Sequence, residues 1–199
     1  MPVSEQIRGD DVEVGQVFVG QRRPAQPVAG EAVQRKDGGA GAITELDVLQ
    51  SAFRSAGGKW STFIIWAKHT FTLGHADYQR QFEPILYGWP AEGTRHWCGA
   101  RDQGDVWNIK KPQKNDLHPT MKPVELVERA IRNSSRPGNV VLDPFGGSGT
   151  TLIAAEKSGR VARLIELDPK YVDVIVRRWE DFTGQTAIRE AADQEVCAS

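Results

Sequence analysis

The stretch VVLDPFGGSGTTLIAAE, residues 140–156, constrains the fold of this chain more than any other part of its sequence. An apolar run ends in an acid, a glycine-rich turn follows, and a helical pattern begins directly after the turn. In α/β folds this order creates a ligand site outside the carboxyl end of a strand, where the helix start offers unpaired backbone N–H groups. Glycines allow positive φ angles and a close approach to the ligand. The stretch therefore predicts a strand, a ligand-binding loop and a helix. Taken alone, its alternative is an ordinary strand-to-helix turn.

Two common nucleotide-binding motifs do not fit this loop. A phosphate-binding P-loop requires a lysine before its last Ser or Thr, and the loop has none. A dinucleotide-binding loop requires a third glycine, and counting on from Gly147 and Gly149 that position is Leu152. What remains is the pattern DxFxGxGT, which begins at Asp143 and ends at Thr150. The loop therefore favours neither a nucleoside triphosphate nor a dinucleotide as its ligand.

Regular α/β patterning continues on both sides of the loop. Helical spacing of apolar residues in HPTMKPVELVERAIRNSS (118–135) predicts a helix before it, and RVARLIEL (160–167) predicts a second strand after it. DPKYVDVIVRRWEDF (168–182) predicts a further helix, with Asp168 as its N-cap and Pro169 in its first turn. This alternation predicts an α/β fold class, a Rossmann-like and mostly parallel sheet with helices on both faces.

A second acid stands at the end of the strand that follows the loop. Glu166 comes about 20 residues after Asp143, the spacing at which α/β cofactor sites place a ribose-binding carboxylate. One carboxylate binds two hydroxyls well because both donors reach its two oxygens. The position of Asp168 favours a helix cap, and a ligand role is compatible with it. We therefore expect Glu166 to hold the ribose of an adenosine-containing cofactor.

Taken together, HPTMKP, DPFGGSGT and IELDPKY resemble the DNA amino-methyltransferases, which transfer a methyl group from S-adenosylmethionine (SAM) to an exocyclic amine of adenine or cytosine. Their order is that of the subgroup whose cofactor-binding half comes last, after the catalytic half and a target-recognition segment. The resemblance covers about residues 45–185 and implies a SAM-methyltransferase type of fold, with a SAM-binding part at 118–182. It implies double-stranded DNA as the partner, in a setting such as restriction-modification. The implied cofactor-binding residues are His118, Thr120, Lys122, Asp143, Pro144, Phe145, Gly146, Gly147, Gly149, Thr150, Glu166 and Asp168.

The resemblance also implies individual roles at this site. Asp143 lies near the methionine part of SAM, and the backbone of 146–149 packs against it. Thr120 and Lys122 contact the methionine end, and His118 shapes the turn that leads to them. The alternative is that Lys122 is solvated and Thr120 only caps a helix.

The segments before residue 118 carry shorter patterns. ITELDVLQSAFRSAGG (43–58) predicts a helix, and STFIIW (61–66) and PILYGW (84–89) predict short strands. Residues 90–117 are polar with a basic run, KKPQK, and predict a long surface loop where the family keeps target recognition. A basic loop with tryptophans suits phosphate contact and stacking, and its alternative is a solvated loop whose tryptophans pack on the core. The expected DNA-contacting residues are Arg101, Trp107, Lys110, Lys111 and Lys114.

The two ends of the chain are the least regular parts of its sequence. Residues 1–44 are rich in Pro, Gly and Ala and predict a poorly ordered leader, with a strand pair in VEVGQVFVG (12–20) as the alternative. Residues 186–199 are expected to form a tail.

The catalytic tetrapeptide of the resembled family, [DNS]PP[YFW], does not occur in this sequence. In that family the target base is flipped out of the duplex, its amine donates to the polar side chain and the proline carbonyl, and the aromatic ring stacks on it. The catalytic residues are therefore unassigned. The sequence is compatible with an unusual active enzyme, with a decayed remnant that binds SAM or DNA without chemistry, and with a chain completed by a second polypeptide.

Composition narrows the remaining classes. The formal net charge of −1 gives no overall attraction to DNA, so contact must come from a local patch. Cys98 and Cys197 lie far apart, which opposes a zinc site or a disulfide framework, and no residue is assigned to a metal. The first residues lack the apolar core of a signal peptide, and no apolar run is of membrane-spanning length. We therefore expect a cytoplasmic protein without a membrane segment. HPTMKP and the basic loop argue against a small molecule or a protein as the methyl acceptor.

Overall fold

The computed structural model describes residues 5–9, 12–19, 46–75, 77–110 and 121–189. These residues form two compact units. Unit 1 comprises the described residues up to 19 together with 121–131 and 136–189, and unit 2 comprises those from 46 to 110 together with 132–135. No helix in these ranges is long and apolar enough to cross a membrane.

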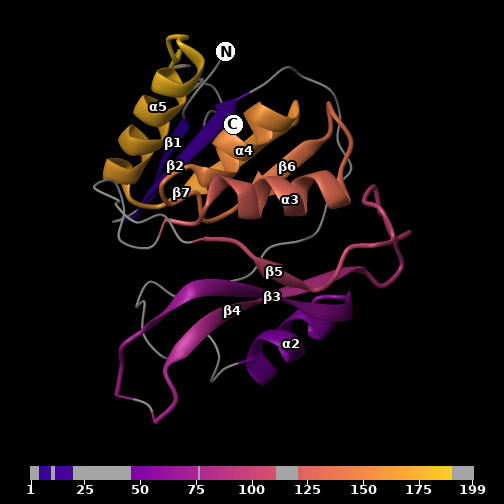
Figure 1. Cartoon of the computed structure of the whole chain (residues 1–199). Helices are drawn as coiled ribbons and strands as arrows, with labels where there is room; N and C mark the ends of the chain where they lie inside the picture. The colour runs from indigo at the N-terminus through magenta and orange to yellow at the C-terminus, as the bar shows by residue number, and fades with distance from the viewer. Residues whose placement is uncertain (1–4, 10–11, 20–45, 76, 111–120, 190–199) are drawn as a thin grey trace. The chain divides into compact units, whose positions relative to one another are not determined.

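Four strands of the described residues form the sheet of unit 1, in the order β1-β2-β7-β6 (Figure 1). β6 (Val140–Asp143) runs parallel to β7 (Val161–Glu166). β2 (Val12–Val19) lies antiparallel to β7, and β1 (Glu5–Gly9) lies antiparallel to β2. The two apolar runs around the glycine loop therefore predict β6 and β7 to within about one residue at their ends.

β1 and β2 differ from the prediction for residues 1–44, where composition indicated a poorly ordered leader. β2 pairs with β7 along five residues, from Gly15 opposite Glu166 to Val19 opposite Ala162. An unpaired edge of β7 would leave its backbone N–H and C=O groups without partners, and β2 supplies them. The alternative for residues 12–20 was a strand pair, and the structure forms one strand there, β2, whose partner β7 lies far along the chain.

α3 (Val124–Ser134), α4 (Thr150–Ser158) and α5 (Pro169–Thr183) lie where helical spacing predicts them. The three helices and the sheet share one core of buried side chains, in which removal of each large apolar side chain from water contributes roughly 1.5–3 kcal/mol. The buried members of this core are Ile131, Leu152, Ile153, Ala154, Ala155, Ala162, Leu164, Ile175 and Trp179.

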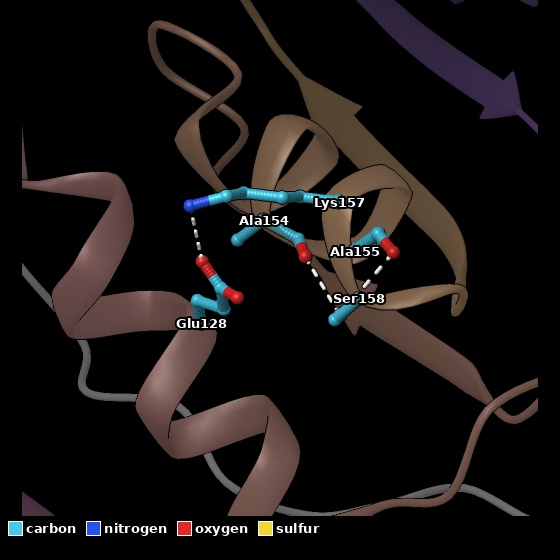
Figure 2. Close-up of polar contacts among 5 residues, drawn as sticks. All are labelled: Glu128, Ala154, Ala155, Lys157 and Ser158. Atoms are coloured by element: carbon cyan, nitrogen blue, oxygen red, sulfur yellow. Dashed lines mark hydrogen bonds and ion pairs between the residues drawn. The ribbon is translucent and has the colours of Figure 1, made fainter.

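One ion pair joins α4 to α3, and a hydrogen bond within α4 lies near it (Figure 2). Lys157 Nζ lies 2.9 Å from Glu128 Oε2, and Ser158 Oγ donates to the carbonyl of Ala154 at 2.7 Å. α4 ends at Gly159, which adopts a φ of 71°. A left-handed glycine is the usual stop of a helix, and the sequence predicts it at this position.

The α/β class is confirmed, and the strand pairing is more mixed than predicted. Within the described ranges β6–β7 and β3–β5 are parallel, whereas β1–β2, β2–β7 and β3–β4 are antiparallel. The described helices of unit 1 pack on the sheet face that carries Val141, Ala162 and Leu164, whereas Leu142 on the other face is 49% exposed. Helices on both faces were predicted, and α3, α4 and α5 are the helices that the structure describes on one of them.

Three strands form the sheet that the structure describes in unit 2, in the order β4-β3-β5. β3 (Gly58–Thr72) and β4 (Arg80–Pro90) are antiparallel, and β5 (Val106–Asn108) runs parallel to β3. α2 (Leu46–Ser55) packs against β3 and lies within the predicted helix. β5 falls inside the segment that was predicted to be a long surface loop.

β3 and β4 are much longer than the apolar runs that predict them. Polar residues continue both strands because each strand satisfies the backbone of the other, with Thr72 still paired opposite Arg80. At the centre of the sheet the indole of Trp66 is 1% exposed and donates to the carbonyl of Ile109 at 2.7 Å. This bond anchors the chain that leaves β5.

Candidate functional site

The glycine loop, defined here as residues 144–149, joins β6 to α4 and folds back over the carboxyl ends of β6 and β7. The N–H of Gly146 donates to the carbonyl of Ile165 at 2.8 Å, which ties the loop to the end of β7. The N–H of Gly149 donates to the carbonyl of Gly146 at 2.8 Å and closes the turn. Gly147 and Gly149 have φ angles of 53° and 74°, a region that side chains disfavour. The loop conformation therefore depends on glycine.

The loop glycines differ in what an added side chain would meet. A Cβ on Gly146 would lie 3.1 Å from Cδ1 of Ile175, and one on Gly149 would lie 3.1 Å from the same side chain. A Cβ on Gly147 would meet only the carbonyl of Phe145, at 3.7 Å. The absence of a side chain at Gly146 and Gly149 thus allows Ile175 of α5 to pack directly against the loop, whereas Gly147 faces open space.

Two carboxylates flank the loop at the ends of neighbouring parallel strands. Asp143 is 6% exposed, and its Oδ1 accepts from the N–H of Phe145 at 2.9 Å. Glu166 accepts from two backbone groups: Oε2 from the N–H of Gly147 at 2.6 Å and Oε1 from the N–H of Asp168 at 3.0 Å. Each carboxylate oxygen has further lone pairs, so both acids can also accept from a ligand. The structure thus brings Asp143 and Glu166 to one edge of the sheet.

Apolar side chains stand beside these carboxylates. Phe145 is 59% exposed in the loop, and Leu167, directly after Glu166, is 54% exposed. Large apolar side chains exposed beside a polar site are a feature of ligand sites. Leu167 was not among the sequence-predicted residues, although an apolar residue next to the strand-end acid is a signal that was available.

Arg178 of α5 is a second residue that sequence reasoning missed. Its Nη1 donates to the carbonyl of Ser148 at 2.9 Å and to Oγ1 of Thr150 at 3.2 Å. Burial lowers the pKa of Arg178 from its ordinary value. The available signal was an arginine at helical spacing from Ile175 on the inner face of α5.

The remaining predicted cofactor residues fall into four groups. Asp168 is the N-cap of α5, accepting from the N–H of Lys170 at 3.0 Å, which confirms the capping role. The carbonyl of Lys122 accepts from Thr150 Oγ1 at 3.4 Å, so HPTMKP reaches the start of α4. Pro144 is an exposed member of the glycine loop. His118 and Thr120 lie outside the described residues.

The residues predicted to contact DNA do not share one environment. Arg101 and Lys110 are exposed in unit 2, and Lys111 and Lys114 lie outside the described residues. Trp107 is 3% exposed, and its Nε1 donates to the carbonyl of Gly104 at 3.0 Å. Its ring belongs to the unit 2 core and presents no face to a base. For Trp107 the alternative, packing on the core, therefore describes the structure.

The chain is similar to known DNA methyltransferases. A family model described as DNA methylase matches residues 17–177. The type II methyltransferase M.Cfr9I of Citrobacter freundii is 37% identical over 97 residues, which are 48% of this chain and 32% of that protein. The chain spans from 27% to 37% of the length of the five curated relatives compared.

Solved structures agree with this match. The M1.HpyAVI–SAM complex aligns with a TM-score of 0.59 at 25% identity, covering 68% of this chain and 70% of that one. A protein of Thermus thermophilus, TTHA0409, named as a DNA modification methylase and solved with S-adenosyl-L-methionine, aligns with a TM-score of 0.54 at 31% identity and covers 73% of this chain and 64% of that one. These likenesses confirm the SAM-methyltransferase type of α/β fold.

Proposed function

The chain belongs to the DNA methylase family, and we propose from this that its glycine loop binds SAM and that it forms the cofactor-binding part of a DNA amino-methyltransferase. The proposed reaction transfers the methyl group of SAM to the exocyclic amine of adenine or cytosine in DNA. The observation that carries the proposal is Glu166, which stands at the end of β7 and is bonded to Gly147 of the glycine loop. Two aligned methylase structures, both named as SAM complexes, support the same cofactor.

The residues around the loop fit the chemical parts of SAM. The remaining lone pairs of Glu166 suit the two ribose hydroxyls, and Phe145 and Leu167 offer apolar surface to the adenine ring. Oδ2 of Asp143 can accept from the ammonium group of the methionine part. When bound, SAM supplies an electrophilic methyl group on a positively charged sulfur. The two carboxylates give the site the opposite sign of charge.

The amine-binding side of the reaction has no assigned residue. The sequence contains no [DNS]PP[YFW] tetrapeptide, so no side chain here is proposed to accept from the target amine. The second candidate is a chain that binds SAM and DNA without a transfer step of its own, or one that receives the tetrapeptide from a second polypeptide. Double-stranded DNA as partner, with contact through exposed Arg101 and Lys110, and a cytoplasmic location are parts of both proposals.

Calorimetric titration with SAM tests the cofactor site. We expect a saturable one-site signal with a dissociation constant around micromolar. Glu166→Ala is expected to weaken binding by roughly 1–3 kcal/mol, because it removes an acceptor of the ribose hydroxyls and of the Gly147 N–H. The matched control is Glu125→Gln, which changes an exposed acid on α3 and is expected to leave the affinity unchanged.

A folded chain that binds no SAM would contradict the proposed site, as would equal affinity in Glu166→Ala and the parent. The transfer step needs a separate measurement. Incubation with methyl-labelled SAM and duplex DNA of varied sequence is expected to label the DNA if the chain acts alone. SAM binding without label transfer would favour the second candidate.

A further inference from the structure

Arg178 contacts the glycine loop from the side of α5. Its Nη1 donates to the carbonyl of Ser148 at 2.9 Å, to Oγ of Ser148 at 3.3 Å and to Oγ1 of Thr150 at 3.2 Å. The side chain is half-buried, whereas its neighbour Arg177 is exposed. A single nitrogen thus joins α5 to the last turn of the loop and to the first residue of α4.

The contacts of Arg178 extend through Thr150 to a second motif. The hydroxyl of Thr150 donates to the carbonyl of Lys122 at 3.4 Å, and it accepts from Arg178 at the same time. One hydroxyl proton and two lone pairs allow both bonds. Hydrogen bonds from Arg178 and Thr150 therefore connect the glycine loop, the start of α4 and the end of HPTMKP.

Electrostatics alone would not place a cation here. The start of a helix carries partial positive charge and favours anions, yet Arg178 approaches the start of α4. Burial of the guanidinium has a further desolvation cost, which lowers the pKa of Arg178. Among the residues that the structure describes, no carboxylate forms an ion pair with Arg178. Its charge-assisted bonds to the loop are what offset these costs.

The bond to Ser148 fixes the orientation of one peptide group. A peptide is planar and trans, so a Ser148 carbonyl that points to Arg178 turns the N–H of Gly149 the opposite way. There that N–H closes the turn on the carbonyl of Gly146 at 2.8 Å. Glycine at 149, with a φ of 74°, makes rotation of this peptide inexpensive when the Ser148 carbonyl has no partner. Arg178 supplies the partner.

We propose that Arg178 is a positioning residue of the SAM site, which holds the Ser148–Gly149 peptide in its binding orientation before the ligand arrives. The proposal rests on the proposed function, since SAM is the ligand for which the loop is held. A loop ordered in advance loses less freedom when it binds, and this raises the affinity without any contact between Arg178 and the ligand.

The test compares Arg178→Met and Arg178→Lys with Arg177→Met, which removes the same charge from the adjacent exposed position. Amide hydrogen exchange of residues 146–153 is measured without ligand, and the dissociation constant for SAM is measured by calorimetry. Arg178→Met is expected to accelerate exchange of the Gly149 N–H about tenfold and to raise the dissociation constant about tenfold, or ~1.4 kcal/mol. Arg178→Lys keeps one donor without the planar fork and is expected to fall between. Arg177→Met is expected to change neither quantity.

Global unfolding by urea separates positioning from a general structural role. Urea denaturation shows whether each variant is fully folded in the absence of denaturant. Under those conditions, a positioning role predicts that amide exchange of the loop and the affinity for SAM still change in Arg178→Met. Unchanged exchange and unchanged affinity in folded Arg178→Met would overturn it, and if that variant does not fold, Arg178→Lys decides by the same two readouts. If the parent chain binds no SAM, the proposed function fails, whereas exchange of the ligand-free loop still decides whether Arg178 holds the peptide.

Discussion

The glycine loop of unit 1 and the cationic-aromatic cluster of unit 2 are ordered by opposite means. In the loop, backbone groups make the contacts: the N–H of Gly146 bonds to the carbonyl of Ile165, and the backbone of Gly147 and Ser148 bonds to the side chains of Glu166 and Arg178. In the cluster, defined as Lys59, Tyr87, Trp89, Arg95 and Trp97, large rings and cations make the contacts. The guanidinium of Arg95 lies 5.7 Å from the ring centre of Trp89 and 5.3 Å from that of Trp97.

The two regions should therefore tolerate different substitutions. A backbone-ordered loop is sensitive to an added Cβ and insensitive to the loss of an exposed side chain. A side-chain-ordered region is sensitive to the loss of a ring, because the contact area and the edge-to-face geometry of pairs such as Tyr87 and Trp89, 5.9 Å apart, disappear with it. The contrast is testable, because each region has a substitution that should affect it and spare the other.

The largest expected effect is the loss of Trp66 from the unit 2 core. Trp66→Ala removes a ring that is 1% exposed and is expected to lower the free energy of unfolding by about 3–5 kcal/mol, measured by urea denaturation. Trp66→Phe keeps a ring but leaves the carbonyl of Ile109 without its donor, and is expected to cause a smaller loss. SAM affinity should stay within about twofold of the parent in both folded variants. A large loss of SAM affinity in Trp66→Phe would mean that the glycine loop depends on the core of unit 2.

The next effect adds a single carbon to the glycine loop. Gly149→Ala places a Cβ 3.1 Å from Ile175 at a φ of 74°, and is expected to lower the free energy of unfolding by about 2–4 kcal/mol through strain and overpacking. Its SAM affinity is expected to fall more than about tenfold. Gly138→Ala is the matched control, with a φ of 82° and nothing within 4 Å of its Cβ. It should lose only the strain of about 1–2 kcal/mol and keep its SAM affinity, and equal effects of both variants would refute the role of Ile175.

The glycine loop could be predicted from the sequence because its requirements are local. Asp143 must end a strand, positive φ angles need glycine, and α4 must begin at once, so all of this is written within a dozen or so residues. Glu166 follows by a fixed spacing, and the structure places it against Gly147. The bond from Arg178 to Ser148 could not be predicted, because an arginine on a mostly apolar helix face does not reveal which carbonyl it meets.

The strands of unit 2 and of the amino-terminal segment depend on pairing between distant residues, which local sequence patterns do not show. β2 is ordered by pairing with β7, and β5 by pairing with β3, each across a long stretch of chain. Trp107 illustrates the consequence: it stands in a polar and basic segment, which favours DNA contact, yet β5 places its ring in the core. Burial of a tryptophan depends on the partner strand, so composition alone could not decide between the two interpretations.

The smallest expected effect concerns the cluster itself. Arg95→Ala removes a cation from between two indole rings, and because Arg95 is exposed the loss of unfolding free energy should be about 0.5–1 kcal/mol. Arg101→Ala removes an exposed charge of the same sign from the same segment, and it should change stability by no more than about 0.5 kcal/mol. Urea denaturation of both variants at low and high salt measures the difference. A loss in Arg95→Ala that persists at high salt fits ring contact, because screening weakens charge–charge interactions between exposed groups most. A loss equal to that of Arg101→Ala would mean that the cation adds nothing to the stability of the cluster. The rings of the cluster would then be ordered by their packing on β3 and β4 alone. The contrast between the two regions would be one between packed rings and bonded backbone groups, without a part for the cations.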